Sequence, residues 1–192
     1  MSWFDSLVQI QLGIMKGSGL FISPTEVLTA AHVVAPNGTI PSMSELTLDI
    51  RFQSRSATPR SVALLPAWVE TRTSGSDIAL VQVDSEDGLG VLPVFGVPAV
   101  NASTMLEGHG FIAATDEQQT LAGHVSFQPP SADEPFLFSA DFSPIPGMSG
   151  GPLVTALGGA VRTAGILAQR SDNHFIGLAA LQSVLALLRA NL

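Results

Sequence analysis

The alternation of apolar and polar residues predicts short β-strands along most of the chain. The segment from Leu46 to Phe52 is the clearest case, because every second residue is apolar and one face of the strand is therefore hydrophobic. Loops rich in Ser, Thr, Gly and Pro separate segments of this kind. They form two blocks of about six strands each, at 7–15, 20–22, 26–30, 46–52, 61–69 and 78–83, and at 104–113, 121–127, 136–139, 152–157, 161–168 and 174–179.

The end of the chain follows a different period. Leu178, Leu181, Leu185 and Leu188 are spaced as on one face of a helix, which predicts an amphipathic α-helix over residues 179–190. Packing of this helix on the body of the protein is the more common arrangement, and binding of a partner protein is the alternative.

The two blocks of strands predict two domains. The stretch between them, from Asp84 to Asn101, holds acidic residues followed by glycines and prolines and is the predicted linker. We expect an all-β fold of two six-stranded antiparallel β-barrels with a C-terminal α-helix, the first barrel in residues 1–95 and the second in residues 96–192. The 192 residues suffice to bury a core without disulfides or a structural metal.

Composition and charge exclude several classes of protein. Hydrophobic residues make up 46% of the chain and charged residues 12%, whereas disorder requires low hydrophobicity and high charge. The net charge of −8 argues against nucleic acid and anionic lipid as partners. The absence of cysteine excludes disulfides and thiolate catalysis.

The sequence also lacks the usual signals for export and membrane insertion. The N-terminus has neither the basic nor the apolar region of a signal peptide. Two long uncharged stretches, 88–106 and 142–161, are interrupted by prolines and glycines and are therefore poor membrane spans. These features predict a cytoplasmic protein, with secretion as the alternative if a leader sequence is missing from this chain.

Three short segments carry residues suited to nucleophilic catalysis. His32 follows an apolar strand on a turn of small residues, where its imidazole would project into a cleft. Asp77 opens an otherwise apolar strand, either as a turn residue at the strand start or as a buried carboxylate that orients an imidazole. Ser149 lies among glycines, which suit a tight turn and also let backbone N–H groups approach a substrate oxyanion.

Taken in order, these segments resemble the trypsin-like (chymotrypsin-fold) serine proteases. The resemblance lies in Thr29-Ala30-Ala31-His32, in Asp77-Ile78-Ala79-Leu80 and in Gly147-Met148-Ser149-Gly150-Gly151-Pro152. It implies that Ser149 is the nucleophile, that His32 is the general base, and that Asp77 orients the imidazole. It also implies an oxyanion hole formed by the N–H groups of Gly147 and Ser149.

The implied chemistry needs neither a metal nor a cofactor, and its substrate is a protein or peptide. The other three histidines, His109, His124 and His174, match no catalytic position and have no paired spacing typical of a metal site. We interpret them as structural or surface residues.

Departures from the family pattern bear on regulation. Digestive members of the family carry, at the position of Met148, an aspartate that pairs with a newly cut N-terminus. This zymogen switch is therefore not expected here. The approach to the serine, residues 141–152, is more similar to bacterial HtrA-like proteases and glutamyl endopeptidases. We therefore expect activity without N-terminal processing. It would be restrained either by an unformed oxyanion loop around Pro144 to Met148, or by a regulatory domain or partner protein, as in an effector module of a larger bacterial system.

The resemblance also implies a specificity pocket beside the serine. Its base would lie near Ser143, and one wall would be formed by Leu167, Ala168 and Gln169. This uncharged lining predicts cleavage after small or medium apolar residues. Entry of Asp141 or Asp172 into the pocket would instead select Arg or Lys.

Two other classes of protein share parts of this pattern. A catalytically silent member of the same fold would act as a protein-binding module. An α/β-hydrolase would also carry the Gly-x-Ser-x-Gly pattern found at residues 147–151, but its aspartate and histidine follow the serine, whereas His32 and Asp77 precede Ser149.

Overall fold

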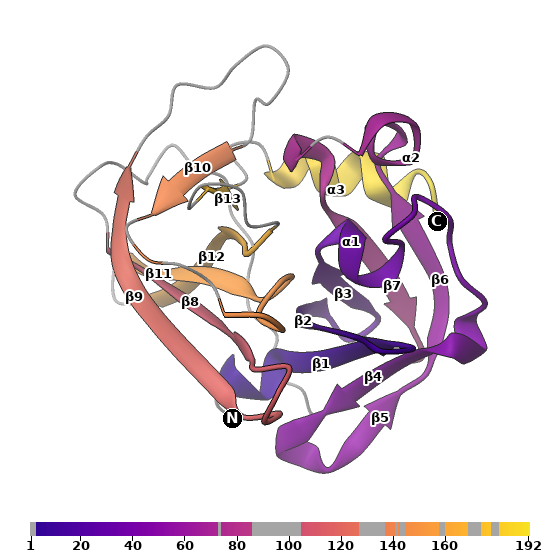
Figure 1. The fold of residues 1–192 in the computed structure, drawn as a ribbon, viewed down its shortest axis with the longest axis horizontal. Helices are drawn as coiled ribbons and strands as arrows, with labels where there is room; N and C mark the ends of the chain where they lie inside the picture. The colour runs from indigo at the N-terminus through magenta and orange to yellow at the C-terminus, as the bar shows by residue number, and fades with distance from the viewer. Residues whose placement is uncertain are drawn as a thin grey trace.

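Two antiparallel β-sheets lie side by side and make up most of the molecule (Figure 1). The computed structural model describes residues 3–72, 74–85, 105–126, 137–140, 142, 145–157, 160–168, 174–177 and 181–192. Most of the predicted linker, from residue 86 onward, lies outside these residues, so the boundary between residues 95 and 96 stays a prediction.

The N-terminal sheet contains seven strands in the order β5-β4-β1-β2-β3-β7-β6. Short helices connect or precede these strands. Two of them are α-helices, α1 (Ala31–Val34) and α2 (Pro66–Thr71). The others are 3-10 turns, η1 (Trp3–Ser6), η2 (Met43–Glu45), η3 (Arg51–Gln53) and η4 (Ser74–Ser76). The strands are β1 (Leu7–Leu12), β2 (Met15–Ser23), β3 (Glu26–Thr29), β4 (Leu46–Ile50), β5 (Arg55–Ala57), β6 (Pro59–Leu64) and β7 (Ala79–Val83).

The seventh strand of this sheet arises where the sequence predicted one long strand over 46–52. Strand β4 ends at Ile50, and η3 follows it directly. Ser54 then adopts a left-handed conformation with φ of 50°, which reverses the chain so that β5 pairs back on β4. The sheet therefore has an extra short edge strand, and β5 and β6 are its two ends, so it is a seven-stranded sheet where the sequence predicted a six-stranded barrel.

The C-terminal sheet closes into a six-stranded barrel, as predicted, in the order β10-β13-β12-β11-β8-β9. A cluster of buried side chains fills it, including Leu106, Leu153, Ala164 and Leu167. The strands are β8 (Met105–Phe111), β9 (Gln118–Ser126), β10 (Leu137–Ala140), β11 (Pro152–Leu157), β12 (Ala160–Ile166) and β13 (His174–Gly177).

The chain ends in helix α3 (Leu181–Arg189), within the predicted range, and this helix packs on the N-terminal sheet beside β6 and β7 (Figure 1). Its residues Val184, Leu185 and Leu188 are buried in the core of that sheet. Each such side chain contributes about 1.5–3 kcal/mol by leaving water. Arg189 also donates to Glu26 at 2.7 and 2.6 Å, and its guanidinium lowers the pKa of that carboxyl. The C-terminus is thus attached to the sheet formed by the N-terminal half.

Candidate active site

Helix α1 places His32 at the edge of the N-terminal core. Strand β3 ends at Thr29, Ala30 keeps an extended backbone with φ of −79° and ψ of 141°, and α1 begins at Ala31. Both alanines are completely buried, and the small side chains let the chain turn tightly against the sheet. The His32 side chain keeps 20% of its surface exposed, so the imidazole is accessible to a substrate.

Asp77 lies beside this helix because β7, which it precedes, is paired with β3. The register sets Thr29 opposite Ala79. Asp77, two residues before Ala79, therefore faces the start of α1. The Asp77 side chain is completely buried. Its Oδ1 accepts the backbone N–H of His32 at 2.8 Å, and its Oδ2 lies 2.7 Å from His32 Nδ1.

This pairing defines the tautomer of the imidazole. A carboxylate only accepts hydrogen bonds, so Nδ1 must carry the hydrogen that it shares with Oδ2. In the neutral ring, Nε2 then keeps its lone pair and is able to accept a proton.

The loop that carries Ser149, residues 146–151, lies against the end of β3 and is called the Ser149 loop below. Gly150 adopts a φ of 84°, and a Cβ at this residue would come within 2.2 Å of both Ser18 O and Thr29 Oγ1. Only glycine fits this close approach. Gly150 therefore lies against Thr29, which precedes His32 by three residues. This contact holds the backbone next to Ser149 near His32, although the serine and the histidine are far apart in sequence.

The hydrogen bonds of the described residues around Ser149 orient two backbone N–H groups, those of Gly147 and Ser149. The Pro146 carbonyl accepts from Ala113 N–H at 2.9 Å, and the peptide bonds of the described residues are trans and planar, so the Gly147 N–H points the opposite way. The Met148 carbonyl accepts from Gly151 N–H at 3.0 Å and orients the Ser149 N–H in the same manner. Among the described residues, neither of these N–H groups has an acceptor, which is the condition that an oxyanion hole requires.

Ser18 on β2 holds the Ser149 loop from the N-terminal sheet, a role that the sequence did not predict. Its hydroxyl donates to the Gly147 carbonyl at 2.8 Å and accepts the Phe111 N–H at 2.9 Å. Its own N–H donates to the Ser149 carbonyl at 2.7 Å. Ser18 is completely buried. The sequence signal that could have found it is its position between Gly17 and Gly19. In the structure a Cβ at Gly17 would lie only 2.5 Å from the side chain of Val33.

A second connection between the sheets fixes the turn that carries Ala113. Asp116 in this turn accepts from Lys16 at 2.7 Å and from Gln9 at 2.6 Å. The Lys16 ammonium, helped by the Gln9 amide, lowers the pKa of the Asp116 carboxyl, which therefore stays ionised at neutral pH. The N–H of Ala113 donates to the Pro146 carbonyl, so the Lys16–Asp116 ion pair also supports the conformation of the Ser149 loop.

The structure does not join every residue that the sequence singled out. No hydrogen bond links the Ser149 hydroxyl to the His32 ring or to any other described residue; such bonds are often long before substrate binds. Leu167 and Ala168 are buried, Leu167 in the core of the C-terminal barrel and Ala168 in the N-terminal cluster. Ser143 and Gln169 lie outside the described residues, so the specificity pocket stays a prediction.

Comparison with solved structures defines the class of fold. A Glu endopeptidase, solved in complex with MPD, matches with a TM-score of 0.78 at 15% identity, over 97% of this chain and 90% of that chain. HBP, known at atomic resolution, matches with a TM-score of 0.75 at 18% identity, over 98% of this chain and 93% of that chain. The predicted chymotrypsin-like fold is confirmed.

The sequence itself gives the family. The profile of the trypsin-like peptidase domain matches residues 17–161, so the chain belongs to the trypsin-like peptidase family, as the resemblance predicted. No curated protein sequence matches the chain. Within the part of the chain that the structure describes, no helix is long and apolar enough to cross a membrane.

Proposed function

We propose that this chain is a serine endopeptidase that hydrolyses peptide bonds through a His32–Asp77–Ser149 triad. The observation that carries the proposal is the buried Asp77 carboxylate, which accepts both the backbone N–H of His32 and its ring Nδ1–H. This arrangement leaves Nε2 free to act as a general base. Membership of a peptidase family supports protein or peptide as the substrate.

In the proposed reaction, Ser149 Oγ attacks the carbonyl carbon of the scissile bond while His32 Nε2 takes the hydroxyl proton. The N–H groups of Gly147 and Ser149 donate hydrogen bonds to the oxyanion as it forms. His32 then gives its proton to the leaving amine, and water releases the acyl group from Ser149 by the same steps. Asp77 does not take the proton itself and stabilises the imidazolium.

A fluorophosphonate probe tests the proposal directly, because it reacts only with a serine that is activated by a base and faces an oxyanion hole. We expect one covalent adduct per chain, located on Ser149 by mass spectrometry of the digested protein. A folded protein that resists the probe would instead favour the silent, protein-binding alternative. Cytoplasmic location and restraint by a regulatory domain or partner remain predictions from the sequence.

Replacing Ser18 by alanine is expected to lower kcat about ten- to a hundredfold with little change in KM. The variant leaves the Gly147 carbonyl and the Phe111 N–H without their buried partner. Each unsatisfied group costs about 1–3 kcal/mol of stability, and the Ser149 loop loses the bond that positions it. Steady-state kinetics and thermal unfolding measure the two effects. Ser23→Ala on the same strand is the matched control, because the Ser23 hydroxyl bonds to its near neighbours Thr25 and Glu26 and not to the Ser149 loop.

The Ser18 assignment also has a clear contrary outcome. If Ser18→Ala lowers the melting temperature but leaves kcat as high as in Ser23→Ala, the residue stabilises the fold without positioning the loop.

The specificity expected from the sequence is cleavage after Ala, Val or Leu. An apolar side chain gains about 25 cal/mol per Å² of surface removed from water, whereas an unpaired Lys or Arg pays for the loss of its hydration. Digestion of a peptide library, read by mass spectrometry, measures the preference. Cleavage mainly after Arg or Lys would contradict this expectation and point to Asp141 or Asp172.

A further inference from the structure

A cavity separate from the candidate active site opens on the outer face of the C-terminal barrel. Leu106 of β8 points into the barrel core, whereas its neighbours Met105 and Glu107 are exposed on the opposite face of the strand and line the cavity. The cavity has a volume of about 520 Å³, which is the size of a small-molecule site. Neither His32 nor Ser149 lines it.

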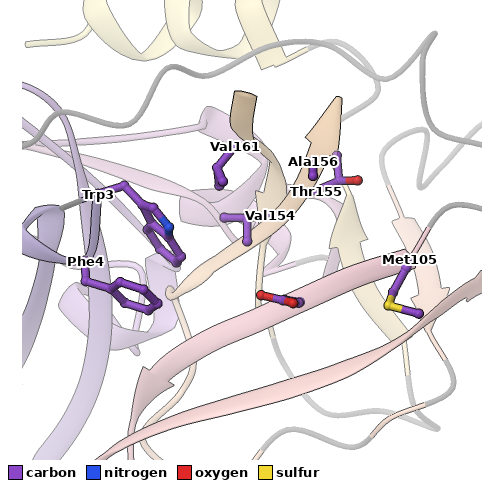
Figure 2. A pocket seen from close by; sticks show the side chains of 8 residues that line it. Trp3, Phe4, Met105, Val154, Thr155, Ala156 and Val161 are labelled. Atoms are coloured by element: carbon purple, nitrogen blue, oxygen red, sulfur yellow. The ribbon is translucent and has the colours of Figure 1, made fainter. Parts of the chain in front are cut away.

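The walls of this cavity are mainly apolar. Turn η1 contributes Trp3 and Phe4, whose rings stack with centroids 4.0 Å apart. Val154 of β11 and Val161 of β12 line it from the barrel, and Figure 2 shows the two aromatic rings on one side of the hollow and Met105 on the other. Apolar surface of this kind binds the hydrocarbon part of a ligand.

Glu107 is the acidic residue of the cavity, and half of its side chain is exposed. Its hydrogen-bond partner is His109, whose Nε2 lies 3.2 Å from Glu107 Oε2 and whose Nδ1 lies 2.9 Å from Thr120 Oγ1. His109 is buried beneath the ring of Trp3, and burial lowers the pKa of its imidazole. The ring is therefore neutral at neutral pH, with Nε2–H donating to Glu107 and Nδ1 accepting from Thr120.

A neutral donor satisfies the Glu107 carboxylate without cancelling its charge. Among the described residues, no lysine or arginine pairs with Glu107. The cavity thus combines apolar and aromatic walls with one negative charge that is open to solvent.

We propose that this cavity binds a small organic cation with an apolar body, of the class of protonated alkyl- or arylalkylamines. The hydrocarbon part would be buried against Val154 and Val161, and the ammonium would pair with Glu107. The stacked rings of Trp3 and Phe4 add apolar surface for the hydrocarbon part. An anion would be repelled by Glu107 and by the net charge of −8.

Matched six-carbon probes test this proposal on the intact chain without reference to peptidase activity. Hexylammonium, 1-hexanol and hexanoate have the same hydrocarbon part and differ only in the head group. Trp3 reports binding by its fluorescence, since Trp68, the other of the two tryptophans, is buried in the N-terminal core. We expect hexylammonium to give a saturable change, 1-hexanol to bind about fivefold more weakly, as for the loss of a half-exposed ion pair, and hexanoate to give no saturable change.

Three variants separate the charge from the cavity. Glu107→Gln should weaken hexylammonium about fivefold and leave 1-hexanol unchanged. Glu117→Gln, a carboxylate outside the cavity, should change neither, and Ala156→Phe should fill the cavity and remove binding of both. Circular dichroism establishes that each variant is folded. The proposal is overturned if hexylammonium gives no saturable change, if hexanoate binds as well as hexylammonium, or if both Glu107→Gln and Ala156→Phe bind hexylammonium like the unaltered chain.

Discussion

Replacement of Ser149 by alanine is expected to abolish labelling by the fluorophosphonate probe and to lower kcat by about a millionfold, the loss that removal of a triad nucleophile causes. The variant lacks the oxygen that would form the acyl-enzyme. Its fold should be unchanged, because the Ser149 hydroxyl makes no hydrogen bond to another described residue and the backbone bonds of Ser149 and Gly150 remain. Peptide hydrolysis and probe labelling measure the effect.

Ser44→Ala is the control for this prediction, since Ser44 is an exposed serine on η2. It should label and cleave like the unaltered chain. Peptidase activity that survives undiminished in Ser149→Ala would show that the nucleophile lies elsewhere.

Replacement of Asp77 by asparagine should lower kcat roughly ten-thousandfold while the protein stays folded. Asp77 accepts two hydrogen bonds from His32, one at each oxygen, and asparagine has only one oxygen to offer. If that oxygen keeps the backbone N–H, the amide NH₂ faces Nδ1 and donates to it. The imidazole is then forced to carry its hydrogen on Nε2, where it cannot accept the proton of Ser149.

This prediction has a readout that separates the tautomer from general damage. Nitrogen NMR of the His32 ring should show Nδ1–H in the unaltered chain and Nε2–H in Asp77→Asn. The triad should also act as one unit, so that His32→Ala combined with Ser149→Ala costs hardly more than either change alone. A double variant whose loss equals the product of the two single losses would contradict the triad.

Much of this architecture could be predicted from local patterns. Alternating apolar residues located the strands, and the helical spacing of leucines located α3, because the side-chain period of an element is written directly in the sequence. Three predicted strands were exceptions. The chain turns at Gly13 within the segment 7–15, and Pro66 begins helix α2 within the segment 61–69. The third exception is the strand at 46–52. Nothing in its alternation showed that Ile50 would end β4 and that Ser54 would adopt a left-handed backbone to start another edge strand.

The sequence by itself also singled out His32, Asp77 and Ser149 and the glycines beside the serine, because their order and flanking residues resemble those of trypsin-like proteases. Only the tertiary structure decided how they are held. The pairing of β3 with β7 brings Asp77 to His32, and Ser18 bonds to the loop of Ser149 across the boundary between the sheets. Contacts between residues more than a hundred positions apart leave no periodic trace in the sequence, and the cavity beside Glu107 exists only because η1 packs against the outside of a closed barrel.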